Sequence, residues 1–361
     1  MAKIYNNKIS IAFDVYGCPQ RCKHCWVGHQ SHSEMNEDEV ISTFLNIKEE
    51  QNENRYYDSE INYLRVDIRE PHCGDNYKEL YGRVDEINDC SVEVENNFEL
   101  ISLWRLVRDE GYVDWLKERG IKKAQLKVFG AEKTNDYFYG RRGAHQDLIK
   151  GTDILLNNEI IPRWQVYYNK MGINELAKVL NITNELNVWK RVSKLGEKFN
   201  IHGCTFDSDG AGFNNHKYRI EKGDEQKIPA RLWRKSKEYF GEDYGLKTEG
   251  ELTKKILNDG EYTLLPESHW LWFFVTSNWD VYPNFMGPAP WWKLGNLKKE
   301  KWKTILDNYK NNKNIGLKTM TEITAKELAE KYGNVNGKKL YNNECELVEY
   351  WVGKYCRDNY H

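Results

Sequence analysis

Three cysteines lie within eight residues near the start of the chain: Cys18, Cys22 and Cys25, spaced C-x3-C-x2-C. Thiolates this close together favour zinc or an iron–sulfur cluster over hard cations. A structural zinc ion takes four protein ligands, and a cubane cluster takes four cysteines. Here only three are local, so a cubane held by them would leave one iron open to an exchangeable ligand. The triplet therefore predicts a metal centre that also binds a small molecule.

A zinc site is the alternative. In that case a more distant side chain such as His29 or His32 would supply the fourth ligand. The spacing alone leaves this alternative open, and it predicts a zinc-binding protein without catalytic activity.

The composition limits the class of protein. A formal net charge of −2, spread along 361 residues, argues against a nucleic-acid-binding surface. No run approaches the ~18 apolar residues of a membrane span, and the N-terminus has no apolar signal core. We expect a cytoplasmic protein without a membrane partner. In a reducing compartment its eight cysteines would be ligands, reactive thiols or core residues rather than disulfides.

The elements around the triplet follow an alternating pattern. Apolar periodicity and Gly or Pro breaks predict strands over residues 8–17, 61–71, 121–130, 159–169 and 200–208, and helices over 36–53, 77–89, 110–120, 144–158 and 173–186. Five or six βα units around a parallel sheet fit before residue 215. After it we expect a charged, mainly helical segment (216–265), a strand and turn (270–284), and helices over 297–312, 324–333 and 343–356.

At the end of the first strand, Cys18, Cys22 and Cys25, with His24 before the last cysteine, resemble the cluster loop of the radical S-adenosylmethionine (radical SAM) superfamily. This resemblance implies an α/β fold, a partial (βα)6 TIM-type barrel with a mainly helical C-terminal extension. It also implies one [4Fe-4S] cluster whose open iron binds S-adenosylmethionine (AdoMet). Reductive cleavage of AdoMet would then give a 5′-deoxyadenosyl radical that abstracts hydrogen from a substrate.

Further stretches carry the resemblance to the AdoMet-binding parts of that family. "IREPH" stands where the family has a Gly-Gly-Glu-Pro stretch, which implies that Glu70 and Pro71 meet the AdoMet amino group. Residues 128–176 resemble the stretch from the fourth to the fifth strand. This implies that Arg141 or Arg142 pairs with the AdoMet carboxylate and that Asn169 contacts AdoMet. His24 belongs to the same cofactor-binding set.

The C-terminal part resembles the SPASM and twitch extensions of radical SAM enzymes around residues 278–306. It keeps Val-Tyr-Pro at 281–283 and Leu-Gly-Asn at 294–296, but Asn284 stands where a cluster cysteine is expected. We therefore expect a barrel over residues 1–215 and an extension over 216–361. The SPASM-like remnant would lie around 270–306 and would carry no auxiliary cluster.

Side chains near the strand ends are candidates for the substrate site, because chemistry in βα barrels gathers at the C-terminal ends of the strands. Cys73, after the second strand, and Cys204, in the sixth, could return a hydrogen atom to a substrate radical, or could be ordinary core cysteines. Asp207 and Asp209 could receive an amine or hydroxyl group.

These observations predict a radical SAM enzyme acting on a small biosynthetic metabolite. We prefer a metabolite because only seventeen residues precede Cys18, which leaves no room for a leader-binding domain. The family implies a flavodoxin or ferredoxin as electron donor. A peptide maturase or epimerase is the alternative, and Cys25-Trp26 also prompts a tRNA-modifying enzyme, against which the balanced charge argues.

Overall fold

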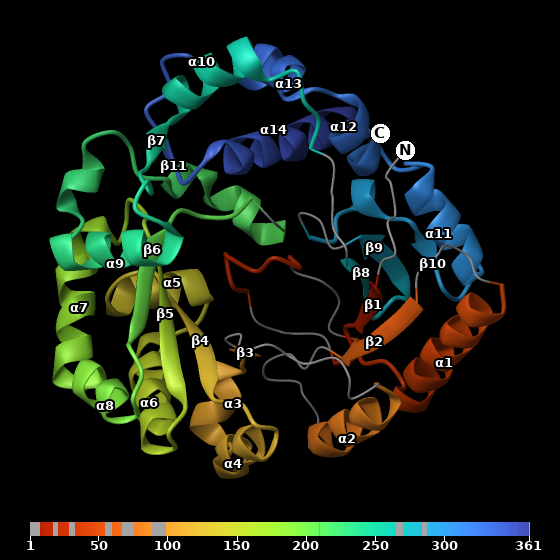
Figure 1. Ribbon diagram of the computed structural model, residues 1–361, viewed down its shortest axis with the longest axis horizontal. Helices are drawn as coiled ribbons and strands as arrows, with labels where there is room; N and C mark the ends of the chain where they lie inside the picture. Colours follow the sequence, from red (N-terminus) through yellow and green to blue (C-terminus); the bar gives the residue numbers. More distant parts are fainter. Residues whose placement is uncertain are drawn as a thin grey trace.

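The computed structural model describes residues 8–16, 21–28, 33–54, 60–66, 76–88, 99–208, 210–264, 270–283 and 287–360. Cys18, Glu70, Pro71, Cys73, Asp209 and Asn284 lie outside these ranges, so the predictions made for them are not addressed below. The architecture is α/β, with two main sheets facing each other and helices around them (Figure 1). No helix in the described ranges is long and apolar enough to cross a bilayer.

The first sheet has four parallel strands in the order β3-β4-β5-β6. The strands are β3 (Glu99–Leu100), β4 (Lys123–Val128), β5 (Ile161–Tyr167) and β6 (Asn200–Cys204). The helices between them are α3 (Leu103–Arg108), α4 (Glu110–Glu118), α5 (Glu132–Tyr139), α6 (Ala144–Asn157), α7 (Leu176–Glu185) and α8 (Val188–Lys194), with a 3-10 turn η1 (Ile173–Glu175). Strands and helices alternate as the sequence predicted.

One face of this sheet packs on helices. Trp164 of β5 is fully buried, and its indole N–H donates to Thr152 of α6 at 3.2 Å. Because side chains alternate along a strand, Gln165 and Tyr167 point to one face of the sheet and Trp164 points to the other. The face that carries Gln165 and Tyr167 is therefore the inner face of the barrel.

Helix α9 (Ala230–Phe240) covers β6, the last strand of this sheet. The Ser236 hydroxyl accepts the Gly203 N–H at 2.8 Å and lies 3.1 Å from the Tyr168 hydroxyl. A Cβ on Gly203 would collide with the Tyr168 ring, which explains the glycine. Although α9 follows residue 215 in the sequence, it packs here as the sixth barrel helix. The domain boundary near 215 stays a prediction.

The second sheet joins the two ends of the chain in the order β10-β9-β8-β1-β2. It contains β1 (Lys8–Phe13), β2 (Glu60–Val66), β8 (Trp270–Val275), β9 (Asp280–Pro283) and β10 (Gly295–Asn296). β1 is parallel to both β2 and β8, whereas β9 is antiparallel to its neighbours. The sequence predicted a strand and a turn over 270–284. The structure has β8 there, followed by a second strand, β9, and places β8 beside β1.

Helices α1 (Glu37–Asn54) and α2 (Tyr77–Ile87) lie on the β2 side of this sheet (Figure 1). Asn36 caps α1: its side-chain oxygen accepts the Glu39 N–H at 3.0 Å.

The SPASM-like motifs meet in this sheet. Gly295 pairs with Val281 and Asn296 with Asp280, so the Val-Tyr-Pro and Leu-Gly-Asn stretches form one antiparallel pair. The Asn296 amide also donates to the Asp280 carboxylate at 2.6 Å.

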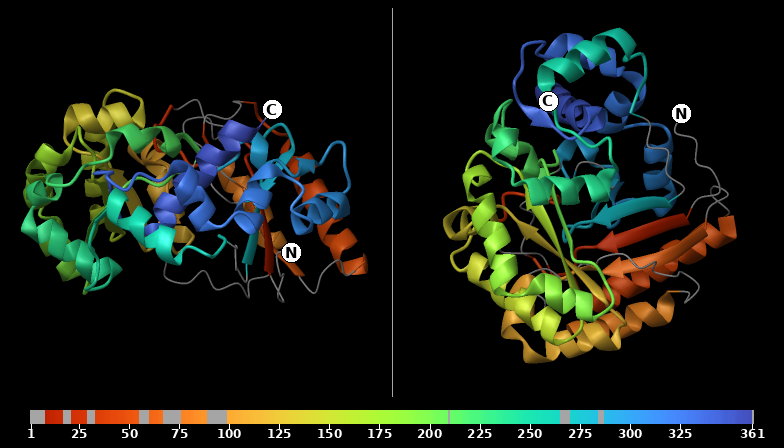
Figure 2. Two further views of the ribbon diagram at one scale, coloured as in Figure 1. Left: turned by 90° about the horizontal axis from the view of Figure 1, so that it is seen from above. Right: turned by 60° about the vertical axis from the view of Figure 1, so that its left-hand side comes forward.

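The helical extension closes the space between the two sheets (Figures 1 and 2). Its helices are α10 (Glu249–Asp259), α11 (Trp302–Lys310), α12 (Ile315–Glu322), α13 (Ala325–Tyr332) and α14 (Glu344–Asn359); shorter elements are η2 (Gly210–Tyr218), η3 (Asp224–Lys227), β7 (Lys247–Thr248), η4 (Pro290–Trp292) and β11 (Leu340–Tyr341). α14 buries Leu347, Trp351 and Cys356 in the same core as β1 and β8. Trp292 is buried over Gly316 of α12, so it packs within the extension.

Candidate active site

The cluster loop, residues 21–28, follows β1 and carries Cys22 and Cys25. Both thiol side chains are half-buried. A turn brings them together: the Cys25 N–H donates to the Cys22 carbonyl at 3.1 Å, and Gly28 N–H to the Cys25 carbonyl at 3.0 Å. Two soft donors on one turn fit an iron–sulfur cluster or zinc. The described ranges hold no group of three His, Cys, Asp or Glu side chains able to bind a metal, and Cys18 lies outside them.

The C-terminal end of α5 holds one side of the cluster loop. Lys23 N–H donates to the Phe138 carbonyl at 2.8 Å, and the Cys22 sulfur lies 3.3 Å from the Tyr139 carbonyl. Gly140 follows with φ of +69°, and a Cβ there would lie 2.6 Å from the Arg21 carbonyl oxygen. A side chain at 140 would therefore push the loop away from α5.

The chain after β6 holds the other side of the loop. Ala211 N–H donates to the Cys25 carbonyl at 2.9 Å, and the Asn215 amide donates to the Lys23 carbonyl at 2.7 Å. A Cβ on Gly210 or on Gly287 would collide with the Trp26 carbonyl oxygen. Gly287 belongs to the extension, so barrel and extension both touch the loop. No motif in the sequence singles out Gly287.

His24 points into an aromatic group below the loop. Its ring centroid lies 4.6 Å from that of Phe129 and 5.3 Å from that of Tyr139. Phe129 in turn stacks on Tyr167 at 5.0 Å. Burial, with a smaller effect of the Lys127 ammonium, holds the pKa of His24 well below its usual value. The His24 ring thus packs as a neutral imidazole among aromatic side chains.

Arg141 and Arg142, equivalent candidates in the sequence, differ in the structure. Arg142 is exposed. Arg141 is largely buried, and one terminal nitrogen pairs with Asp147 at 2.6 Å. Its Nε and Nη2 are buried with no hydrogen-bond partner among the described residues. Unsatisfied buried donors are costly, so Arg141 is the better candidate for an anionic group such as the AdoMet carboxylate.

Asn169 lies just past β5 and is fully buried. Its amide nitrogen donates to the carbonyls of Phe129 at 2.7 Å and Tyr167 at 2.9 Å, and its oxygen accepts the Gly172 N–H at 2.8 Å. The side chain therefore ties the ends of β4 and β5 together. Its contact with AdoMet stays a prediction.

Cys204 ends β6 inside the barrel. Gln165 of β5 donates to its sulfur at 3.4 Å. Burial, and then the neighbouring Asp207 carboxylate, raise the pKa of the thiol. The group is therefore a thiol rather than a thiolate at neutral pH, as a hydrogen-atom donor would have to be. Its catalytic role stays a prediction. In the extension, Cys345 is exposed and Cys356 is buried, with its sulfur 3.7 Å from the Thr319 hydroxyl.

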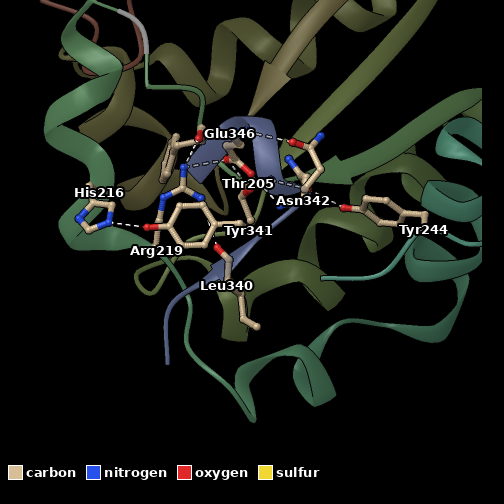
Figure 3. A network of polar contacts seen from close by, with 10 residues as sticks. Thr205, His216, Arg219, Tyr244, Leu340, Tyr341, Asn342 and Glu346 are labelled. Atoms are coloured by element: carbon tan, nitrogen blue, oxygen red, sulfur yellow. Dashed lines mark hydrogen bonds and ion pairs between the residues drawn. The ribbon is translucent and has the colours of Figure 1, made fainter. Parts of the chain in front are cut away.

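A buried polar network joins the end of β6 to α14 (Figure 3). Glu346 accepts from the Thr205 hydroxyl at 2.6 Å and from Arg219 at 2.7 Å. Arg219 also donates to the carbonyls of Phe206 at 2.5 Å and Leu340 at 3.2 Å. The network fixes the segment that leads from β6 to Ala211 and the cluster loop.

Comparison with known proteins places the fold. No protein-family model matches the chain, and no curated protein matches it in sequence. Among solved structures it is similar to anSMEcpe, a SPASM-domain radical SAM enzyme, with AdoMet and the Cp18Cys peptide bound. The TM-score is 0.52 and the identity 15%, over 97% of this chain and 99% of that one. The same protein with the Kp18Cys peptide gives 0.52 and 14%, over 97% and 99%.

Streptococcus suis SuiB bound to its precursor peptide SuiA gives a TM-score of 0.48 at 12% identity, over 84% of this chain and 65% of that one. The likeness to anSMEcpe shows that this chain has the radical SAM fold. The predicted partial barrel with a helical extension is therefore confirmed.

Proposed function

We propose that this chain is a radical SAM enzyme that modifies a peptide. A [4Fe-4S] cluster held by Cys18, Cys22 and Cys25 would supply the electron that cleaves AdoMet into methionine and a 5′-deoxyadenosyl radical. The electron would come from a carrier of the flavodoxin or ferredoxin class. The radical would then abstract hydrogen from the peptide.

The observation that carries this proposal is the likeness, over nearly the whole of both chains, to a protein with AdoMet and a peptide bound. The small metabolite expected from the sequence gains no support from these comparisons, and the peptide alternative fits them better. The cluster loop also follows β1 directly, and chemistry in βα barrels gathers at the C-terminal ends of the strands.

Each candidate residue would have a separate role in this reaction. Cys22 and Cys25 would bind iron as thiolates. Arg141 would use its free Nε and Nη2 donors to orient the AdoMet carboxylate. His24 and Phe129 would close the inner side of the loop to water.

Release of 5′-deoxyadenosine tests the proposal. The protein is reconstituted anaerobically with iron and sulfide, reduced with dithionite and incubated with AdoMet, with and without cysteine-containing peptides. We expect release that peptides stimulate. A protein that binds zinc instead of iron and releases nothing would return the chain to the zinc-site alternative. Stimulation by small metabolites but not by peptides would restore the substrate class expected from the sequence.

A further inference from the structure

The guanidinium of Arg357, on α14, lies over two aromatic rings from two other elements. Its central carbon lies 3.7 Å from the ring centroid of Phe213, in η2, and 4.8 Å from that of Trp291, in η4. Phe213 in turn stacks on Tyr350 of α14, with 5.0 Å between the ring centroids. These rings hold the cation in one place, although the Arg357 side chain is exposed.

Both rings belong to segments that touch the cluster loop. Phe213 comes two residues after Ala211, whose N–H donates to a carbonyl of the loop at 2.9 Å. Trp291 comes four residues after Gly287, where a Cβ would collide with another carbonyl oxygen of the loop. Two and four residues of extended chain span at most about 7 and 14 Å. Arg357 is therefore fixed near the cluster loop from two directions.

The edge of the Arg357 guanidinium is open. Stacking on rings uses the faces of this planar group, whereas its N–H donors lie in the plane and point outward. Among the described residues, none forms an ion pair or a hydrogen bond with these donors. Asp358, the next residue, instead accepts from the Tyr332 hydroxyl at 2.7 Å. Lys354, one turn earlier on α14, adds a second positive charge to this surface.

Other ring-stacked arginines of the chain show what such a group binds. Arg119 also lies over two rings, Tyr81 at 4.8 Å and Trp115 at 5.3 Å, and it donates to both carboxylate oxygens of Asp85. Three more arginines lie over a ring and pair with a carboxylate: Arg105, Arg108 and Arg219. Arg357 has the same support from rings, so another molecule can supply its carboxylate.

We propose that Arg357 is a specificity residue that binds a carboxylate of the peptide substrate beside the cluster loop. AdoMet has a single carboxylate, for which Arg141, next to the contact between α5 and the loop, is the candidate. This inference rests on the proposed function and adds the substrate class: a peptide with an acidic group near the site of modification.

The test uses the reconstituted, AdoMet-loaded protein and measures the Kd of fluorescent nonapeptides with a central cysteine and blocked ends. Each peptide carries one glutamate, placed at each other position in turn, and has a glutamine counterpart. One further peptide has no glutamate but a free C-terminal carboxylate, compared with its amide. For at least one of these carboxylates we expect binding about tenfold tighter than for the neutral counterpart, as a charge-assisted hydrogen bond would give.

Arg357→Gln should bring that ratio close to one without changing the Kd of the neutral peptides, and Arg357→Lys should keep part of it. Arg231→Gln is the matched control, because Arg231 is an exposed arginine of α9 that lies over the Trp189 ring at 3.7 Å. It should leave the ratio unchanged. Equal binding of acidic and neutral peptides by the wild type, or a ratio that persists in Arg357→Gln, would overturn the inference. So would an equal loss of affinity for both kinds of peptide, which a purely structural role predicts.

An electron carrier with an acidic surface is the other partner that such a cation could bind. In that case Arg357→Gln would slow release of 5′-deoxyadenosine driven by reduced flavodoxin but not by dithionite, and the peptide ratio would not change. This result would overturn the inference.

Release of 5′-deoxyadenosine with dithionite, measured in the same samples, separates this inference from the proposed function. Peptide-stimulated release without a preference for the acidic peptides would leave the proposed function standing and remove the role of Arg357. A preference lost in Arg357→Gln, without stimulated release, would do the opposite. Absence of any peptide binding would contradict both.

Discussion

The two sheets of the barrel are built in different ways. In the β3–β6 sheet, neighbours in space are neighbours in sequence, and each parallel pair is joined through helices. In the other sheet, β1 lies between β2 and β8, and β8 comes from the far end of the chain. The first arrangement follows from short right-handed crossovers, whereas the second needs a long-range contact.

The cluster loop lies where these two kinds of structure meet. It hydrogen-bonds to residues 138–139 and 211–215, on the side of the first sheet, and it packs against Gly287 from the extension. The proposed catalytic centre therefore depends on the first sheet and on the extension. Substitutions in these two regions should affect it to different degrees.

The largest effect should come from the loop itself. Cys22→Ala removes a cluster ligand, so we expect loss of bound iron and of 5′-deoxyadenosine release, measured after identical reconstitution. Cys345→Ala, an exposed thiol on α14, is the control and should keep both. Full iron and activity in Cys22→Ala would contradict the assignment of the loop.

The next largest effect should come from the network that joins the extension to β6. Glu346→Ala leaves the Arg219 guanidinium buried without its counter-ion, which should lower the free energy of unfolding by about 3–5 kcal/mol. Urea denaturation measures it. Glu330→Ala, at an exposed position of α13, should change stability by less than about 0.5 kcal/mol.

A double variant sharpens this test. If the loss comes from the uncompensated charge, Arg219→Met combined with Glu346→Leu should be more stable than Glu346→Ala alone. If the double variant is no better, the network acts through its hydrogen bonds rather than through charge.

A smaller effect should come from the contact between the extension and the cluster loop. Gly287 and Gly196 have nearly the same backbone conformation, with φ of +76° and +78°. A Cβ at 196 meets open space, whereas at 287 it meets the Trp26 backbone. Gly287→Ala should therefore cost about 1–3 kcal/mol more than Gly196→Ala, as overpacking does. Of the two variants, only Gly287→Ala should weaken AdoMet binding. Equal effects of the two would show that the extension does not support the loop.

The smallest effect should appear in the acid sensitivity of β6, the edge of the first sheet. Burial, and then Arg163, lower the pKa of His202 to about 3. The imidazole takes up a proton near pH 6.5 in the unfolded chain but only near pH 3 in the folded protein. The free energy of unfolding should therefore be highest above pH 6.5 and should fall as the pH drops toward 3. His202→Phe keeps the stacking on Tyr239 and should lose less stability between pH 7.5 and 5 in urea unfolding. An unchanged loss would exclude His202 as a source of the acid sensitivity.

The sequence by itself determined what depends on short-range order. The cysteine spacing, the helix cap at Asn36 and the alternation of strands with helices follow from local periodicity and local hydrogen bonds, which is why they could be predicted. The pairing of residues 280–283 with 295–296 also fits this rule, since the two stretches are close in sequence.

The tertiary structure alone decided which side chains are available for chemistry. Arg141 and Arg142 are adjacent and identical in type, yet packing leaves Arg141 with two buried donors that bond to no described residue, whereas Arg142 is exposed. The Asn169 side chain is held by hydrogen bonds to backbone groups at the ends of β4 and β5. The physical reason is that hydrogen-bond satisfaction and desolvation depend on neighbours brought together from distant parts of the chain.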